Sequence, residues 1–232
     1  MRHLARAAVV AVAVLATVLS TAPGWASAGT ERAQRRLNVL GCDAGPADGS
    51  LGTHTTAAVL RFQGANRLAQ SGRLDDGTRS RLYAATPVHC DRRPVPASGS
   101  GRRIVVSQRQ NYVWLLRSDG SVAAQDPMVD NTRYLSTGTY RAGSKCGRAA
   151  KIRNNSDASG RLRLHNFVRF APCGIGFHQV PQYRSTGAQI HPNWLLGTNL
   201  RESHGCLRLT RAMSDRVWDF TVTGTKVVVV RG

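Results

Sequence analysis

A chain of 232 residues, 41% of them hydrophobic, is too long and too apolar to be a disordered tail, and it allows one or two domains of ordinary size. Lys and Arg number 32 against 13 Asp and Glu, which favours polyanionic partners. Nucleic acid is disfavoured among them, because the arginines are scattered through both halves rather than gathered in one stripe with interleaved aromatic residues.

The first 28 residues are typical of an export signal. Arg2 and Arg6 give a basic start, residues 7–19 form an uncharged apolar run, and Ala26-Ser27-Ala28 matches a small-x-small cleavage site. We expect cleavage after Ala28. The apolar run is shorter than the roughly 20 residues of a membrane span, so we expect no stable membrane anchor. Export also separates the chain from nucleic acid, so we expect none as partner and favour an anionic wall polymer.

Three short helices are predicted after the signal. The first covers residues 31–42, the second is capped by Thr55, and the third begins at Asp76 or Thr78. Their apolar positions at helical spacing form the expected core: Ala33, Leu37, Leu40, Ala58, Val59, Phe62 and Leu82. A bundle of this size is marginal by itself, so a covalent staple would stabilise it.

The turn before the second helix carries a specific pattern. The run Asp48-Gly49-x-Leu51-Gly52-x-x-Thr55-x-x-Ala58-Val59-x-x-Phe62-Gln63 resembles the bacterial peptidoglycan-binding domain of three helices. The resemblance covers about residues 31–85. It implies that surface residues of the turn and the second helix contact glycan and peptide. A generic helical hairpin is the plainer interpretation, and the same apolar positions form the core in both.

A stretch rich in Pro, Ser and Gly follows, and beyond it the pattern changes to short β-branched and aromatic runs. The second half is therefore predicted to be mainly β and sandwich-like, with one helix from about Thr210 to Phe220. Expected strands are 104–107, 112–116, 139–141 and 227–230, the last one buried, with a hairpin turn at 118–120. The predicted organisation is a signal (1–28), an all-α three-helix domain (29–90), a linker (91–103) and a β domain (104–232).

Five cysteines are an odd number for an oxidising compartment, so one thiol should be left over. Counting alone does not identify it. Cys42 and Cys90 flank the helical domain suitably for a disulfide, and Cys146 and Cys173 are better placed as a disulfide than as metal ligands. We expect no metal site, because zinc would need further Cys or His at ligand spacing.

Cys206 lies in the run Ser203-His204-Gly205-Cys206-Leu207-Arg208, shortly before the predicted helix. A neighbouring imidazolium and helix-end amides are expected to lower the pKa of this thiol. Gly205 has no Cβ, so the backbone can approach a substrate carbonyl, and its amide could form an oxyanion hole with that of Cys206.

A thiolate needs a base, and a histidine distant in sequence is the usual one. Position sets aside four of the seven histidines: His3, His54, His89 and His204. His178 ends the strand-like run Gly174-Ile175-Gly176-Phe177-His178, which would hold an imidazole rigidly, whereas His191 precedes Pro192 in a looser stretch. His178 is therefore favoured. His165 is interpreted as structural.

The run at Cys206, together with Ile175-Gly176-Phe177-His178 and Ser136-Thr137-Gly138-Thr139-Tyr140, resembles the YkuD-type L,D-transpeptidase domain over roughly residues 103–231. The resemblance implies Cys206 as nucleophile, His178 as general base and the Gln179 carbonyl as the group that orients the base. It further implies that Ser203, His204 and Arg208 bind substrate. The interval from His178 to Ser203 is longer than in many members, which suggests an inserted loop at about 181–196 and keeps His191 as a weaker candidate base.

The resemblance implies acyl transfer without a cofactor in a secreted, cell wall-associated enzyme. The thiolate attacks the stem-peptide bond before the terminal D-alanine, and the acyl group passes to a neighbouring stem amine in a 3→3 cross-link. Water in place of the amine would make the enzyme an L,D-carboxypeptidase. A papain-like endopeptidase is disfavoured, because there the Cys precedes its His and no His follows Cys206. A non-catalytic wall-binding protein is the remaining alternative.

Overall fold

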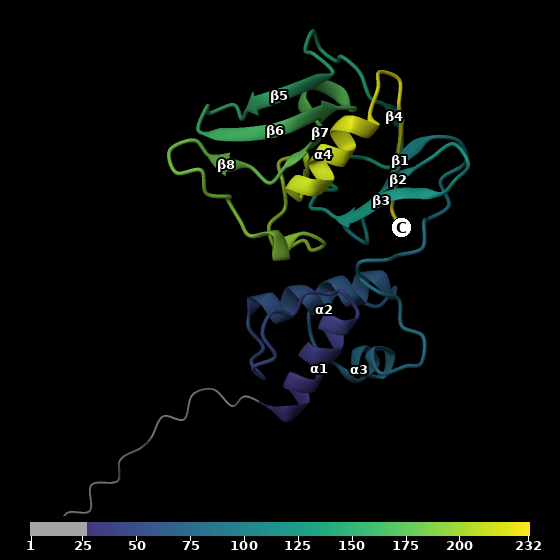
Figure 1. The fold of residues 1–232 in the computed structure, drawn as a ribbon, viewed down its shortest axis with the longest axis vertical. Coiled ribbons are helices and arrows are strands. Elements are labelled where there is room, and N and C mark those ends of the chain that lie inside the picture. Colours follow the sequence, from purple (N-terminus) through teal and green to yellow (C-terminus); the bar gives the residue numbers. More distant parts are fainter. Residues whose placement is uncertain (1–26) are drawn as a thin grey trace, which may run out of the picture.

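The structure, a computed structural model, describes residues 27–232, and Figure 1 shows a helical unit followed by a larger unit built mainly of strands. The predicted fold class, an all-α bundle followed by a mainly-β domain, is confirmed. The predicted export signal lies outside the described residues apart from Ser27 and Ala28. None of the described helices combines the length and apolar character needed to cross a bilayer.

The helical unit contains α1 (Ala28–Val39), α2 (Thr53–Ala65) and α3 (Asp76–Leu82). The Ser27 side chain caps α1 and that of Asp75 caps α3, each accepting a hydrogen bond from a first-turn amide. The three helices enclose one apolar core formed mainly by Ala33, Leu37, Leu40, Ala58, Val59, Phe62 and Leu82. These are the residues that helical spacing predicted.

The predicted capping role of Thr55 is wrong. Gly52 is the N-cap of α2 and has no side chain to offer, while Thr55 lies within the first turn and is buried. Its hydroxyl donates to the Ser50 carbonyl (3.1 Å) and accepts from Gln34 Nε2 (3.0 Å). The threonine therefore ties the glycine-rich turn to the bundle instead of closing the helix end.

The β unit contains two sheets. The first has the strand order β3-β2-β1-β10-β4, with bounds β1 Arg103–Ser107, β2 Tyr112–Leu116, β3 Val122–Pro127, β4 Gly138–Arg141 and β10 Lys226–Val230. Strand β10 runs parallel to β1 inside the sheet, and Val227 and Val229 are buried, so the predicted buried C-terminal strand is confirmed.

The second sheet has the order β5-β6-β7-β9, with β8 paired to β6. Its strands are β5 Lys151–Ser156, β6 Leu162–Arg169, β7 Gly176–Gln179, β8 Gln182–Tyr183 and β9 Leu207–Leu209. Helix α4 (Arg211–Phe220), capped by Thr210, contacts β6 and β7 of this sheet and β3 of the other. Apolar side chains from both sheets and α4 form the main core.

The segment between the two units has no helix or strand before Arg103, but its first half is anchored. Arg93 is 3% exposed, donates to the Cys90 and Gln110 carbonyls, and its own carbonyl accepts from the Trp114 indole. Val95 packs on the buried cluster that contains Tyr112 and Trp114. These contacts attach the segment to the helical unit through Cys90 and to the β unit through Gln110 and Trp114.

Two disulfides connect the pairs that the sequence favoured. One joins Cys42 to Cys90 in the helical unit, and the other joins Cys146 to Cys173 in the β unit. Cys206 is the free cysteine of the described residues.

Candidate active site

Parallel pairing of β7 with β9 brings the two halves of the site together. His178 stands opposite Arg208 in the register, and Phe177 stands opposite Leu207, so Cys206 enters β9 beside the beginning of β7. Gly176 makes this position of β7 possible, because a Cβ there would lie 2.6 Å from the Val168 carbonyl oxygen of β6.

A cavity of about 320 Å³ opens beside this pair of strands. Cys206 and His178 both line it, together with Ser203, His204 and Arg208 from the nucleophile loop. Strand β6 and the η1 segment (Pro172–Gly174) supply further lining residues, namely Phe167, Arg169 and Gly174. The structure thus gathers most of the predicted site residues around one hollow.

His178 is 2% exposed and its ring stacks on Phe167. Its Nδ1 lies 2.6 Å from the Gln179 carbonyl oxygen. Since a carbonyl oxygen only accepts, Nδ1 carries the proton, which leaves the Nε2 lone pair available as a base. Burial is the main cause that lowers the pKa of His178 from 6.5 to about 4, and Arg208 lowers it further, so the ring is neutral at neutral pH.

Cys206 is half-buried, and its Sγ donates to the Gly174 carbonyl at 3.2 Å. Burial raises the pKa of the Cys206 thiol above its ordinary value, although a backbone hydrogen bond and the charges of Arg208 and Arg169 oppose the shift. The expectation of a lowered pKa is therefore wrong. The two expected causes do not act on the thiol, because strand β9 lies between Cys206 and the first turn of α4 and because the His204 side chain is exposed.

Gly205 adopts a φ of +114°, which a side chain would strain, and an added Cβ would lie 3.1 Å from Tyr134 Cβ. Its amide donates to Ser203 Oγ at 3.0 Å. The expected oxyanion role of this amide does not follow from the geometry, because the N–H is already engaged. Ser203 is buried; its amide donates to the Asp130 carbonyl, and its carbonyl accepts from the Asn131 side-chain amide. Since its hydroxyl also accepts from the Gly205 amide, Ser203 fixes the nucleophile loop at the cavity.

Arg169 is a residue of the cavity that sequence reasoning missed. It ends β6, is 1% exposed, and lies over the Phe167 ring with its carbon Cζ 4.8 Å from the centroid. Nε donates to the Ala149 carbonyl, but Nη1 has no partner among the described residues. A guanidinium within the apolar run 167–170 was the available signal, because a buried cation normally requires an anion.

The structure does not bring His191 into this cavity. His191 is 5% exposed and lines a different hollow, between the helical unit and the β unit.

Arg208 is nearly buried and donates to the Arg201 carbonyl at 3.1 Å, which fixes its position beside Cys206.

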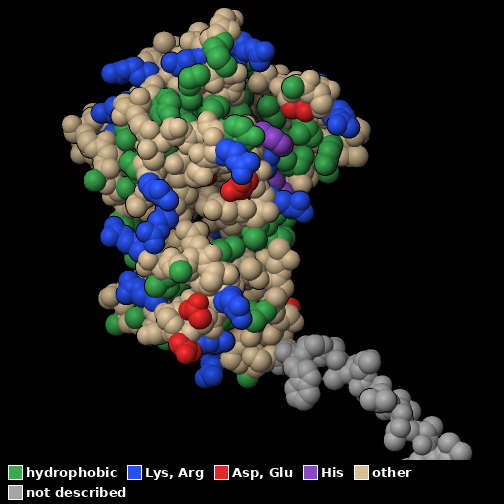
Figure 2. All heavy atoms as spheres, turned by 180° about the vertical axis from the view of Figure 1, so that it is seen from behind, with side chains coloured by type: hydrophobic (Ala, Val, Ile, Leu, Met, Phe, Trp, Pro, Cys, Tyr) green, Lys and Arg blue, Asp and Glu red, His purple; other side chains and the backbone are tan. Residues whose placement is uncertain are grey.

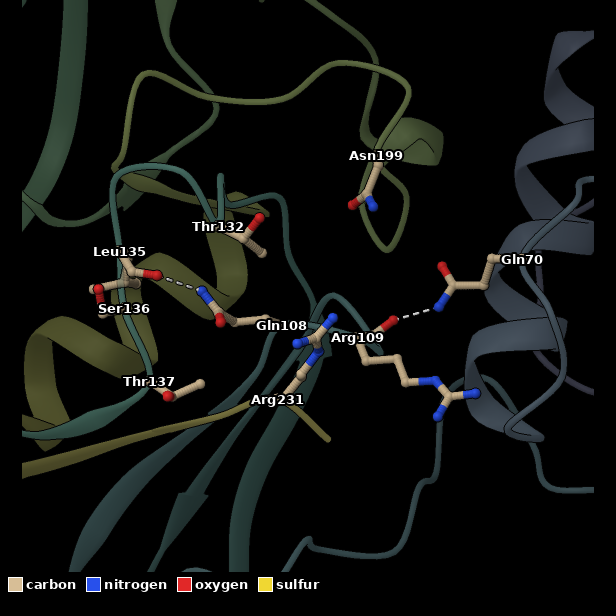
Figure 3. A pocket seen from close by; sticks show the side chains of 9 residues that line it. All are labelled: Gln70, Gln108, Arg109, Thr132, Leu135, Ser136, Thr137, Asn199 and Arg231. Carbon is tan, nitrogen blue, oxygen red and sulfur yellow. Dashed lines mark hydrogen bonds between the residues drawn. The ribbon is translucent and has the colours of Figure 1, made fainter.

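The remaining surface offers little competing chemistry. A larger cavity of about 810 Å³ lies between Gln70 of the helical unit and Gln108, Arg109 and Arg231 of the β unit, but it contains neither a cysteine nor a histidine (Figure 3). Residues 27–232 contain no cluster of three His, Cys, Asp or Glu side chains suited to a metal ion. Figure 2 shows basic side chains spread over both units and few acidic ones on that face.

Two family models match the chain. Residues 27–82 match a peptidoglycan binding domain, and residues 101–229 match the L,D-transpeptidase catalytic domain called YkuD. Because the second match covers more than half of the sequence, the chain belongs to the YkuD L,D-transpeptidase family. A search of curated proteins found no match.

This chain is also similar to solved structures of L,D-transpeptidases. A protein from Xylanimonas cellulosilytica is 21% identical, with 88% of this chain and 94% of that chain covered and a TM-score of 0.48. The corresponding values for one from Stackebrandtia nassauensis are 18%, 88%, 91% and 0.47, and for one from Mycobacterium smegmatis 20%, 57%, 59% and 0.42. At these values the family membership rests on the family models.

Proposed function

We propose that this chain is a peptidoglycan L,D-transpeptidase in which Cys206 is the nucleophile and His178 the general base. One observation carries the proposal: a free thiol and a neutral imidazole with an available Nε2 line the same cavity. The Gln179 carbonyl holds the ring in the tautomer that a base needs. No other free thiol exists among residues 27–232.

In the first step, His178 Nε2 takes the thiol proton as Cys206 Sγ attacks the carbonyl of the third stem residue. The amide bond to the terminal D-alanine breaks, the leaving nitrogen takes the proton back from His178, and a thioester remains on Cys206. The raised pKa of the thiol fits this order, because proton transfer then accompanies attack instead of preceding substrate binding.

In the second step, the side-chain amine of a neighbouring stem attacks the thioester. His178 removes a proton from the amine, the carbon–sulfur bond breaks, and the thiolate is reprotonated. The product is a 3→3 cross-link. Attack by water gives a trimmed stem instead, so the same site accommodates L,D-carboxypeptidase activity as the alternative outcome.

Two guanidinium groups supply charge to these steps. Arg169 and Arg208 both lower the pKa that burial would otherwise give Cys206, so both stabilise the thiolate. Ser203 and His204 complete the lining on the side of the nucleophile loop.

The helical unit is proposed to hold the enzyme on its polymer, as its match to a peptidoglycan binding domain supports. Two disulfides and the sequence pattern of residues 1–28 support a secreted, cell wall-associated protein. The excess of basic residues suits anionic wall polymers as additional partners.

Mass analysis of products tests the proposal. The full chain, incubated with tetrapeptide muropeptides, is expected to release D-alanine and to form dimers joined through their third stem residues. Monomeric tripeptide alone would assign the carboxypeptidase alternative. Unchanged muropeptides under conditions where the protein is folded would favour the non-catalytic alternative.

A further inference from the structure

The segment η1 forms one wall of the cavity beside the proposed nucleophile. Its last residue, Gly174, lines the cavity, and the Gly174 carbonyl accepts the hydrogen bond from Cys206 Sγ at 3.2 Å. This bond exists only while Cys206 is a thiol, because a thiolate has no proton to donate. A carbonyl oxygen held at this distance therefore favours the protonated form of Cys206 over the thiolate.

The residue before Gly174 is fixed covalently. Cys173 is bonded to Cys146, which lies 27 residues earlier in the chain. The loop that carries Cys146 is itself attached to the end of β6, where the Arg169 amide donates to the Ala150 carbonyl at 2.8 Å. The disulfide thus ties the wall that carries Gly174 to the end of a strand whose last residue lines the same cavity.

Both cysteines of this pair adopt a backbone conformation that side chains seldom take. The angle φ is +51° at Cys146 and also at Cys173, in the left-handed region that costs free energy for any residue with a Cβ. The disulfide is a covalent constraint on two residues whose backbone would otherwise favour negative φ. Loss of this bond would let the turn that carries Gly174 relax away from Cys206.

The two disulfides of the structure differ in their exposure to solvent. Cys146 and Cys173 are both exposed, whereas Cys42 and Cys90 are buried in the core of the helical unit. A disulfide is opened when a thiolate attacks one of its sulfur atoms, so it must be accessible. The pair next to the proposed nucleophile is therefore the one that a dissolved reductant reaches first.

We propose that Cys146 and Cys173 are positioning residues for the nucleophile: their disulfide holds the Gly174 carbonyl against Cys206, so the redox state of the pair controls how reactive Cys206 is. The inference rests on the proposed role of Cys206. The reductant is a dithiol, one thiolate of which attacks a sulfur of the pair to form a mixed disulfide. Its second thiolate then displaces the remaining cysteine. The dithiol gives up two electrons and two protons and becomes a disulfide, and Cys146 and Cys173 become thiols.

Opening the pair should make Cys206 react faster with a small electrophile. Burial raises the pKa of Cys206, and the carbonyl of Gly174 adds to this by accepting the thiol proton. A relaxed η1 segment reduces both effects, so more thiolate is present at neutral pH.

The other charged groups of the cavity do not account for a faster reaction. The charged and titratable side chains that line it with Cys206 are Arg148, Asp157, Arg169, His178, His204 and Arg208. Of these, Arg148 lies in the loop of Cys146 and would move with it. Removal of its positive charge would disfavour the thiolate, which is the opposite effect.

Alkylation of Cys206 by iodoacetamide in the full chain, followed over a range of pH, tests the inference. The variant Cys146→Ser/Cys173→Ser removes the pair without adding a thiol. At neutral pH its Cys206 should be alkylated about twofold to tenfold faster, the effect of one lost hydrogen bond, and the midpoint of the pH profile should move to lower pH. The matched variant Cys42→Ser/Cys90→Ser removes the other disulfide and should keep the rate and profile of the unaltered chain. An unchanged or slower alkylation in Cys146→Ser/Cys173→Ser would overturn the inference.

A second arm covers the case in which the variant without the exposed pair does not fold, as circular dichroism would show. The unaltered chain is treated with dithiothreitol at the lowest concentration that opens the Cys146–Cys173 bond, and peptide mapping gives the alkylation rate of Cys206 separately. The same acceleration is expected, and an equal rate before and after reduction would contradict the positioning role. Release of D-alanine from a tetrapeptide by the unaltered, oxidised chain reports the proposed chemistry separately, so either proposal can fail alone.

Discussion

Two histidines were candidates for the general base that acts on Cys206, and single substitutions distinguish them. His178→Ala is expected to lose several orders of magnitude in activity, because general base and general acid roles contribute roughly 10²–10⁴-fold each. His191→Ala should lose far less, since His191 lines another cavity. Rates of D-alanine release from a tetrapeptide measure both. The reverse order of losses would show that His178 is not the base.

Protonation of His178 predicts the acid limb of the pH profile. The base works only when neutral, and its pKa is lowered to about 4, so kcat/KM should stay level from neutral pH to about 5 and fall as the pH passes through about 4. A histidine with a depressed folded pKa also withdraws stability as the pH falls below 6.5, so circular dichroism must establish that the protein remains folded. A limb near 6.5 would contradict the buried, neutral base.

Arg169 predicts a charge effect that a merely structural residue would not produce. Arg169→Met keeps the bulk over Phe167 but removes the cation, so the pKa of Cys206 should rise and iodoacetamide should alkylate the thiol more slowly at a given pH. Arg169→Lys should restore part of the rate. Arg153→Met, on the exposed part of β5, is the matched control. An unchanged pH profile of alkylation in Arg169→Met would exclude the electrostatic role.

The site was predictable to the extent that it lies in one local run. The nucleophile loop and the strand-like run that ends at His178 are each continuous in sequence, so their residues could be recognised from the local pattern. Arg169 could not be assigned, because the pairing of β6 with β7 places it opposite Gly176, and only the folded sheet brings it to the cavity that Cys206 lines. Engagement of the Gly205 amide by Ser203 likewise depends on loop conformation, which spacing does not reveal.

At the level of elements, apolar periodicity decided what could be predicted. Strand β2, with the run YVWLL, is buried throughout and was predicted with its observed bounds. Strand β5, with the run KIRNNS, was missed, because it is a polar strand at a sheet edge with no buried residue. The helix α4 was predicted from the spacing of Met213 and Val217, which lie four residues apart, and in the structure both are buried.

Helix α2 is also an element of the contact between the units. Arg61→Ala would leave the buried carbonyls of Cys42 in the helical unit and Leu196 in the β unit without this donor, so we expect it to lower the free energy of unfolding by on the order of 3 kcal/mol. Arg32→Ala, on the exposed face of α1, should change it by less than about 0.5 kcal/mol. Urea denaturation measures both. Equal midpoints and slopes for the two variants would contradict the bridging role of Arg61.

At the scale of the whole molecule, a truncation at the predicted linker would remove residues that pack on the β unit. Removing residues before Arg102 would strip Arg93 and Val95 from the aromatic cluster around Trp114. Composition alone could not show this, because Pro, Ser and Gly suit an anchored connection as well as a loose one. The contribution of the helical unit is better tested with surface variants of the full chain.

The central claim, that Cys206 carries the acyl group, is tested most directly by the intact mass of the protein during turnover. Mixed with a tetrapeptide muropeptide and quenched in acid, the full chain should gain the mass of the substrate less D-alanine, and peptide mapping should place this adduct on Cys206. Denatured without reductant, the unreacted protein should take up one alkyl group at the same residue, since the other cysteines are paired. D-alanine release that persists in Cys206→Ala, or an adduct mapped to any other residue, would contradict the account.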